Sequence, residues 1–290
     1  MKVLITGIKS FTGKHLESLL ASNNYNVNGT CLSKDNNYFS CDITNLHNVN
    51  DVINKYRPNI IIHLAAITYV AHSNIEEIYN TNIVGTKNIL EAFKSLDVND
   101  KHFIFASTAN VYKPSDNVIN ESSAIKPVND YAISKLAAEN VVNLYKPFFN
   151  TTILRFFNYT GLHQDTKFLI PKIISHFKAK KEVIELGDIS ISRDFSDVRD
   201  ICKVYKEVIS KNLKHSIYNV CSGSAYSIAD IIGICEKITS HNIEVYVNQD
   251  FIRPNEIKSI TGSISKLNSI TQNIERINIK DTLKWMIDGV

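Results

Sequence analysis

Two residues of the stretch YAISK, Tyr131 and Lys135, have the types and spacing of a proton-transfer pair. Residues four apart share one helix face, so the lysine ammonium can lie beside the phenol. A free tyrosine has a pKa of about 10, and a nearby positive charge lowers it. Such a tyrosine can exchange a proton with a sugar hydroxyl or carbonyl while a hydride moves to or from a nicotinamide. Taken alone, this spacing more often marks two surface residues of a helix.

Two other segments support the catalytic interpretation. The apolar run HFIFAST ends at Thr108, whose hydroxyl could contact the same substrate oxygen. The opening stretch VLITGIKSFTG is an apolar strand followed by a turn with Gly7 and Gly13, which is typical of a dinucleotide pyrophosphate site at a helix N-terminus. Ser10 stands where the middle glycine is expected. We expect it to face the pyrophosphate, with backbone N–H groups carrying most of the binding.

The adenosine end of a dinucleotide has candidate ligands in the next segments. Asp42 could accept the adenine amino group while Ile43 packs on the ring, although Asp42 could equally begin the following helix. The second strand, TCLSK at 30–34, does not end directly in the carboxylate that NAD-preferring enzymes use for the ribose. Ser33 and Lys34 would instead suit a 2′-phosphate. NADP is therefore favoured, and NAD remains possible.

Alternating strand and helix patterns must position these residues, which predicts an α/β fold with a Rossmann-like, doubly wound parallel sheet. Residues 1–157 are expected to form the NAD(P)-binding domain, with segments of 190–222 returning to it. Residues 158–290 are expected to form mostly a smaller, lid-like domain that binds a nucleotide sugar. The expected strands are 2–6, 25–32, 59–66, 102–108, 151–156, 216–220 and 243–247, and the expected helices are 11–22, 46–56, 81–96, 130–148, 168–181, 193–210 and 225–238, with Asp197 capping the 193–210 helix.

The composition excludes several other classes of protein. The 290 residues are 44% hydrophobic and 21% charged, as in ordinary globular proteins. A net charge of +3, dispersed along the chain, argues against nucleic-acid binding. The five cysteines lack metal-ligand spacing and indicate reduced, buried thiols of a cytoplasmic protein. We expect no signal peptide and no membrane span, because strand-like sequence begins at residue 3 and apolar runs are short.

The motifs together resemble the extended short-chain dehydrogenases/reductases, the family of nucleotide-sugar epimerases, dehydratases and reductases. TGIKSFTG, HLAA, STANVY, YAISK and RFFN occur in the order of that family over almost the whole chain. GKHL, LGDISISRDFSDV, YNVCSG and the RPNE-to-SKL stretch are similar to its GDP-4-keto-6-deoxy-D-mannose reductase branch. This resemblance implies NADPH-dependent reduction of C4 in a nucleotide-activated 4-keto-6-deoxyhexose, for deoxysugar biosynthesis.

The resemblance also assigns residues by position. Thr108, Tyr131 and Lys135 are the implied catalytic triad, and Lys135 also holds the nicotinamide ribose. The implied cofactor-binding residues are Gly7, Ser10, Phe11, Thr12, Gly13, Asp42, Ile43, Leu64, Ala65 and Ala66. The implied ligands of the nucleotide diphosphate are Asn158, Arg193 and Arg253. The segment FLIPK could contact the base through Leu169 and Ile170 and the phosphates through Lys172, which could equally be a solvated helix lysine.

Departures from the family pattern separate the possible reactions. Ala109 and Asn110 follow Thr108 where dehydratases carry acidic residues, so dehydration is not expected. Asn110 and Phe168 also replace the Cys and His of 3,5-epimerising relatives. An NAD-dependent 4-epimerase remains an alternative because its triad is the same, and an NADP-sensing interaction protein is the non-enzyme alternative. His63 is expected to be a buried core residue.

Apolar residues on more than one face of the helices 81–96 and 130–148 would suit the contact of a homodimer. The nucleotide base, the C4 configuration and the oligomeric state stay open at this point.

Overall fold

The computed structural model describes residues 1–290 except 69–71, 212, 214, 253–257, 272–273 and 290. Arg253 therefore lies outside the described residues. The chain forms two compact units. Unit 1 comprises residues 1–113, 121–156 and 202–219, and unit 2 comprises 114–120, 157–201 and 220–290. In the part of the chain that the structure describes, every helix is too short or too polar to cross a lipid bilayer.

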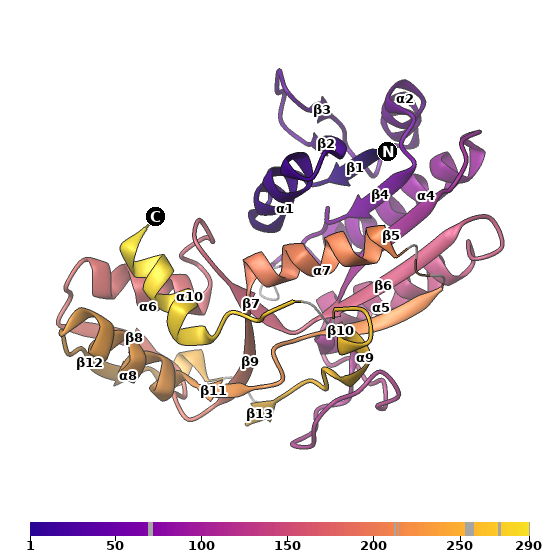
Figure 1. The fold of residues 1–290 in the computed structure, drawn as a ribbon. Helices are drawn as coiled ribbons and strands as arrows, with labels where there is room; N and C mark the ends of the chain where they lie inside the picture. The colour runs from indigo at the N-terminus through magenta and orange to yellow at the C-terminus, as the bar shows by residue number, and fades with distance from the viewer. Residues whose placement is uncertain (69–71, 212, 214, 253–257, 272–273, 290) are drawn as a thin grey trace. The chain divides into compact units, whose positions relative to one another are not determined.

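Unit 1 is built on a seven-stranded sheet with the order β10-β6-β5-β4-β1-β2-β3 (Figure 1). The pairings of β1 with β2 and β4, of β2 with β3, of β4 with β5 and of β5 with β6 are parallel, as the alternation of strands and helices predicts. Figure 1 shows α1 and α7 on one side of this sheet and α4 and α5 on the other. The strands are β1 (Lys2–Thr6), β2 (Asn26–Cys31), β3 (Phe39–Ser40), β4 (Ile60–His63), β5 (His102–Thr108), β6 (Asn150–Phe156) and β10 (Ser216–Val220). The helices are α1 (Phe11–Ser22), α2 (Leu46–Tyr56), α3 (Ile75–Tyr79), η1 (Asn80–Gly85), α4 (Thr86–Ser95), η2 (Ala109–Val111), α5 (Asp130–Asn143) and α7 (Val198–Ser210), whose first four residues belong to unit 2.

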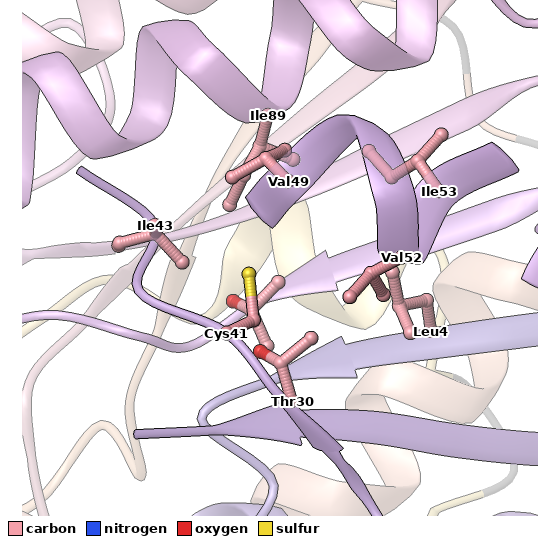
Figure 2. A pocket seen from close by; sticks show the side chains of 9 residues that line it. Leu4, Thr30, Cys41, Ile43, Val49, Val52, Ile53 and Ile89 are labelled. Carbon is pink, nitrogen blue, oxygen red and sulfur yellow. The ribbon is translucent and has the colours of Figure 1, made fainter. Parts of the chain in front are cut away.

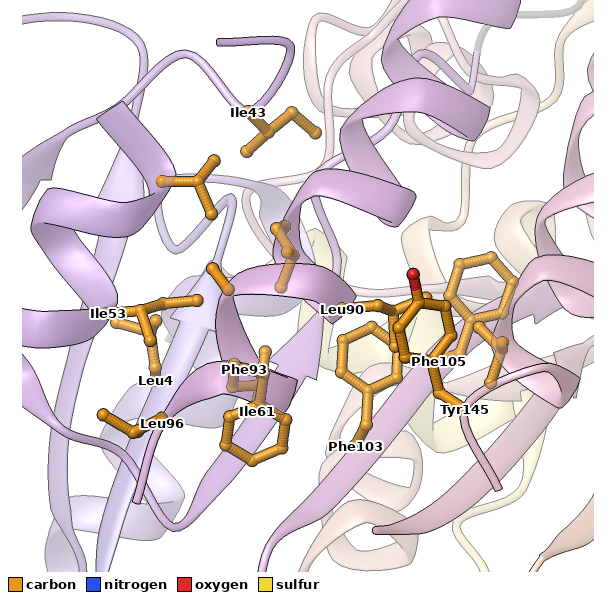
Figure 3. Close-up of a cluster of buried hydrophobic side chains, with 14 of the residues drawn as sticks. Leu4, Ile43, Ile53, Ile61, Leu90, Phe93, Leu96, Phe103, Phe105 and Tyr145 are labelled. Atoms are coloured by element: carbon orange, nitrogen blue, oxygen red, sulfur yellow. The ribbon is translucent and has the colours of Figure 1, made fainter. Parts of the chain in front are cut away.

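The core of unit 1 lies between this sheet and α2, α4 and α5. Because its central strands are covered on both faces, they are continuous apolar runs, and all four residues of β4 are buried. Figure 3 shows Phe103 and Phe105 of β5 beside Leu90 and Tyr145. Burying such side chains contributes roughly 1.5–3 kcal/mol each, which holds the helices on the strand ends that carry the candidate site.

The expected helix over 81–96 is interrupted in the structure. Residues 80–85 form η1, a π-helical segment, between α3 and α4. Its wider turn places Asn82 inside the protein, where the amide accepts from the Ile67 N–H at 2.9 Å and donates to the Ile67 carbonyl at 3.0 Å. The apolar pattern of residues 81–96 gives no sign of this wider turn, so it predicted one continuous helix.

Unit 2 contains small sheets and a helical layer. In one sheet β9 pairs with β7, β11 and β13, and in another β8 pairs with β12. Ile174 of α6, Ile231 of α8 and Leu283 of α10 are buried in one apolar cluster. The elements are β7 (Asn158–Thr160), α6 (Leu169–Lys178), β8 (Val183–Leu186), β9 (Ser192–Asp197), β11 (Ala225–Ser227), α8 (Ile228–Thr239), β12 (Glu244–Val247), η3 (Gln249–Phe251), β13 (Ser259–Ile260), α9 (Ser265–Asn268) and α10 (Ile279–Asp288).

The expected helix over 193–210 is wrong in its first five residues. Residues 192–197 form β9, which has neighbouring strands on both edges, and α7 begins only at Val198. Asp197 accepts from the Arg199 N–H at 2.7 Å, which confirms it as the cap of this helix. The three residues 225–227, expected to be helical, likewise form β11 beside β9. Tertiary pairing overrides the local helical pattern in both segments.

Candidate active site

The first turn of unit 1 has the close packing that a dinucleotide site needs. Gly7 has φ +70°, a left-handed conformation that favours glycine. A Cβ at Gly13 would lie 2.3 Å from the Ile8 carbonyl oxygen, so helix α1 can approach this turn only because residue 13 lacks a side chain. A Cβ at Gly7 would lie 3.0 Å from the Ala65 backbone nitrogen, so the turn and the segment after β4 lie together. These glycines form a cradle that fits a pyrophosphate.

Ser10 has a structural task in the same turn. It is the N-cap of α1, and its hydroxyl accepts from the Gly13 N–H at 3.1 Å. Its exposed position still leaves it at the helix N-terminus, where an anion is favoured. Phe11, half-buried, packs edge-on against His15, and Thr12 is buried. Ser10, which stands in place of the usual middle glycine, therefore caps the start of α1.

The structure brings together part of the predicted adenosine site. Ile43 is buried beside η1, where a Cβ at Gly85 would lie 2.6 Å from its Cδ1. Asp42 is exposed and accepts from the backbone and hydroxyl of Thr44, at 2.9 and 2.7 Å. Helix α2 is capped by Asn45 instead, so Asp42 is not the cap that the sequence left as an alternative.

A small cavity lies beside Ile43 and Cys41 in the interior of unit 1 (Figure 2). Leu4, Val49 and Val52 also line it, and its volume is about 10 Å³. This is at the lower limit for one water molecule and far too small for an adenine ring. The cavity lies in the apolar core of unit 1 and shares Ile43 with the predicted adenosine site.

A basic residue that the sequence interpretation missed lies in the glycine turn. The Lys9 ammonium is 2.5 Å from a carboxylate oxygen of Asp35 and donates to the Ser33 hydroxyl at 3.3 Å. Its hydrogen bond to Asp35 raises the pKa of Lys9, and the same bond lowers the pKa of Asp35. Lys34 is exposed next to this cluster. Asp35, four residues after the end of β2, neutralises the charge of Lys9 in this conformation. A lysine inside the turn was the signal available in the sequence.

The three residues of the predicted triad come from β5 and α5, which pack on each other in unit 1. Thr108 ends β5, is buried, and accepts from the Asn110 N–H at 3.2 Å. Tyr131 is half-buried in the first turn of α5, whose N-cap is Asn129. Lys135 lies one turn further on the same face and is only 3% exposed.

The environment of Lys135 disfavours its charge. Burial lowers its pKa to about 7, although the nearby Glu139 carboxylate opposes this shift. Its Nζ lies 4.1 Å from the centroid of the Phe105 ring, which offers a cation–π contact to the ammonium. A lysine that titrates near neutrality beside a tyrosine is suited to control a proton.

A buried polar network supports the helix that carries this pair. Asn82 donates to the Ser134 hydroxyl at 2.9 Å, and Thr86 donates to the Asn82 carbonyl at 2.6 Å. The two ring nitrogens of His63 lie 2.7 Å from the Thr6 hydroxyl and 2.9 Å from the Thr86 hydroxyl. Burial lowers the pKa of His63 to about 3, so it is neutral, which confirms the predicted core histidine. Sequence reasoning missed Asn82, because a lone Asn in an amphipathic pattern reads as a surface residue.

Apart from Thr108, the predicted substrate residues that are described lie in unit 2. Asn158 is exposed on β7 and pairs with Phe195, which places it near Arg193 on the neighbouring strand. Arg193 is half-buried and donates to the Ser192 carbonyl at 2.8 Å. Half-buried Leu169 begins α6. Lys172 on the same helix donates to the Glu185 carbonyl at 2.7 Å and lies over the Phe251 ring, so it is not simply solvated.

Comparison with known proteins agrees with this arrangement. The profile of the NAD dependent epimerase/dehydratase family matches residues 3–221. GDP-6-deoxy-D-talose 4-dehydrogenase of Aggregatibacter actinomycetemcomitans is 36% identical over 94% of this chain and 92% of its own length. GDP-6-deoxy-D-mannose reductase of Pseudomonas aeruginosa is 29% identical over 99% of this chain and 96% of its own. The structure of RMD from Pseudomonas aeruginosa complexed with NADPH superposes with a TM-score of 0.87 at 28% identity, covering 99% of this chain and 96% of that one.

The parallel Rossmann sheet, the glycine turn and these relatives define the protein as an NAD(P)-dependent enzyme of nucleotide-sugar metabolism. The chain belongs to the NAD dependent epimerase/dehydratase family, that is, to the extended short-chain dehydrogenases/reductases.

Proposed function

We propose that the protein reduces the C4 keto group of a nucleotide-activated 4-keto-6-deoxyhexose with NADPH. The observation that carries this proposal is the buried lysine of α5: Lys135 follows Tyr131 by one turn on a helix packed against the strand that ends at Thr108. Unit 1 would bind the dinucleotide and unit 2 the nucleotide sugar. The names of the two relatives above, both of which act on GDP-linked 6-deoxyhexoses, favour a GDP sugar.

Each triad residue has a distinct task in this reaction. A bound nicotinamide cofactor supplies the hydride. Tyr131 gives its phenolic proton to the oxygen of C4, and Thr108 donates a hydrogen bond to the same oxygen as it gains negative charge. Lys135 stabilises the phenolate that Tyr131 becomes and holds the nicotinamide ribose. Burial excludes water from Lys135, which strengthens its electrostatic effect on Tyr131.

Lys9 and Ser33 support the preference for NADPH. A 2′-phosphate would offer Lys9 a doubly charged partner in place of Asp35, and Ser33 a second acceptor. Lys34 is close enough in sequence to add a further charge.

Ile43 and Asp42 would hold the adenine, and Leu64, Ala65 and Ala66 would line the nicotinamide half, because Ala65 adjoins the glycine turn.

Two residues in the next loop disfavour loss of water. Ala109 is buried and Asn110 is exposed in the short helix η2, so neither supplies the carboxyl group that a dehydratase needs.

In unit 2, Asn158 and Arg193 would bind the diphosphate, since a guanidinium fits two phosphate oxygens. Leu169 and Ile170 would contact the base. We also propose a role for Lys172 and Arg253 at the phosphates, although Lys172 would first have to leave the Glu185 carbonyl.

We infer that the protein acts as a homodimer in the cytoplasm. Exposed apolar side chains lie on α5 and at its C-cap, with Ile133 41% and the capping Leu144 71% exposed, and Val84 of η1 is exposed as well. All five cysteines, each within the described ranges, are buried, which fits a reducing compartment.

The test is an assay with NADPH and a panel of GDP-, dTDP-, CDP- and UDP-4-keto-6-deoxy sugars, followed by NMR of the product. We expect stoichiometric oxidation of NADPH with the GDP sugar and strong loss of turnover in Tyr131→Phe. The product configuration decides between the 6-deoxymannose and 6-deoxytalose series, which differ at C4. Conversion of a sugar at C4 without net NADPH loss, with NAD retained, would establish the 4-epimerase instead. Binding of NADPH without turnover of any sugar would leave the non-catalytic alternative.

A further inference from the structure

The face of α5 that carries Tyr131 and Lys135 continues one turn further to Glu139, which is only 2% exposed. An ionised carboxylate is costly to bury unless it is fully paired. Glu139 meets this condition, because Arg155 of β6 donates to it through Nε at 2.9 Å and through its terminal nitrogen at 2.6 Å. Ser107 of β5 donates a third hydrogen bond, at 2.5 Å.

These contacts link the elements that hold the candidate triad. Ser107 directly precedes Thr108, and Glu139 lies one turn after Lys135, so one carboxylate fixes the end of β5 against α5. Arg155 is itself 5% exposed and lies over the Tyr112 ring, 4.8 Å from its centroid. Tyr112 donates to the buried Asn219 side chain at 2.6 Å, which extends the network to β10.

We propose that Glu139, held by Ser107 and Arg155, is a positioning residue that keeps the Lys135 side chain in its ammonium form and fixes its helix on the sheet. This inference rests on the proposed function for the role of Lys135 in catalysis. Glu139 does not touch the substrate in this proposal. It acts through Lys135, which in turn acts on Tyr131.

Among the charged and titratable groups around Lys135, Glu139 is the one whose charge favours the ammonium form of the lysine. From its own helix Lys135 faces Tyr131 and Glu139, and from β4 it faces His63, whose pKa is about 3. His63 is therefore neutral near pH 7 and adds no charge. Arg155 on β6 is engaged by both oxygens of Glu139. Burial lowers the pKa of Lys135 to about 7, and the Glu139 carboxylate acts in the opposite direction. Without that carboxylate, Lys135 would lose its proton at a lower pH.

The experiment compares Lys135 in four proteins by NMR of ¹³C-labelled lysine side chains, with its signal assigned from a Lys135→Arg variant. The proteins are the wild type, Glu139→Gln, the double variant Glu139→Gln/Arg155→Met and a control, Glu91→Gln. The control removes a half-buried carboxylate of α4 that accepts the Tyr145 hydroxyl at 2.5 Å and lies outside this network. The double variant removes the unpaired guanidinium that Glu139→Gln alone would leave buried, so it serves if the single variant does not fold.

We expect the titration midpoint of Lys135 to fall by about one pH unit in Glu139→Gln. It should stay below the wild-type value in the double variant, even where the melting temperature recovers, and should not move in Glu91→Gln. The high-pH loss of kcat should shift by the same amount, with little change in KM. A Lys135 midpoint equal to that of the wild type in a folded Glu139→Gln or double variant overturns the proposal, because the pair would then be purely structural.

Loss of the role of Glu139 and loss of C4 reduction would give different results. The NMR midpoint does not require turnover, so a shifted midpoint in a protein that reduces no sugar supports the role of Glu139 and removes the C4 reductase. Normal turnover with an unshifted midpoint does the reverse.

Discussion

At the scale of single residues, Lys135 combines a charge with a site that resists charge. Its ammonium is buried against Phe105, and the carboxylate of Glu139 offsets only part of the desolvation. Burial of this charge therefore lowers the folding stability of the protein, as expected for a functional group and not for a structural one.

Replacing Lys135 with Met should stabilise the protein in a pH-dependent way. Folding lowers the pKa of Lys135 from 10.5 to about 7, so the folded state binds fewer protons between these values. The free energy of unfolding of the wild type therefore rises with pH across this interval. The advantage of Lys135→Met should be greatest at about pH 7 and below, of the order of a few kcal/mol, and should shrink toward pH 10.5. Urea unfolding at several pH values measures it, with exposed Lys87→Met as a control that should show no such trend.

Lys9 gives a second prediction at the residue scale. Lys9→Ala should weaken NADPH binding by roughly 10- to 100-fold and leave NADH binding almost unchanged, because a charged hydrogen bond contributes about 1.5–3 kcal/mol. Titration calorimetry with both cofactors measures the two affinities. Lys34→Ala is the matched variant, because Lys34 is the lysine that the sequence alone assigned to the 2′-phosphate. Equal weakening for NADPH and NADH in Lys9→Ala would show that this lysine does not read the 2′-phosphate.

At the scale of elements, the π-helical segment η1 is the feature that joins β4 and Ile43 to α5. Through Asn82 and Thr86 it connects Ser134 to His63, and through Gly85 it lies against Ile43. A regular α-helix would place Asn82 on another face, because the π turn changes the angular position of every later side chain. The irregular turn is therefore part of the scaffold of the site.

Removal of the Asn82 amide should be costly. Asn82→Ala leaves the Ile67 N–H and carbonyl without their buried partner, which should lower the free energy of unfolding by about 2–3 kcal/mol. Asn88→Ala is the comparison, because Asn88 also donates two hydrogen bonds, to the carbonyls of Ile43 and Thr44, from a half-buried position. Chemical denaturation of both variants should show the larger loss for Asn82. A loss no greater than that of Asn88→Ala would mean that η1 is not held by this side chain.

The sequence predicted the elements of the Rossmann sheet and less of unit 2. Apolar strands such as 60–63 and the helix 46–56 follow from their own patterns, and the glycine turn and YAISK carry local motifs. β9 could not be predicted in the same way, because its strand conformation depends on pairing with β7 and β11 from distant parts of the chain. The buried ion pair of Glu139 and Arg155 was also invisible, since an isolated Glu and Arg in a sequence usually indicate surface positions.

At the scale of the whole molecule, the exposed apolar face of α5 predicts self-association. Ile133 lies on α5, and Leu144 is the C-cap of this helix about three turns further along. Ile133→Glu and Leu144→Glu should each convert a dimer to a monomer, because a charge would be buried in the interface. Light scattering after gel filtration measures the mass. Leu46→Glu, on the exposed start of α2, should leave the dimer intact. A monomeric wild type would show that this dimer does not form. Dimeric Glu variants would show that the contact lies on another surface.

The central claim is that hydride from NADPH arrives at C4 of a 4-keto-6-deoxy nucleotide sugar. It is tested most directly by NADPH that carries deuterium at the transferable C4 position of the nicotinamide. With GDP-4-keto-6-deoxymannose, we predict one deuterium at C4 of the sugar product for each NADPH oxidised, seen by NMR and mass spectrometry, and almost none with Tyr131→Phe. A converted sugar without deuterium, or deuterium at another carbon, would contradict the account.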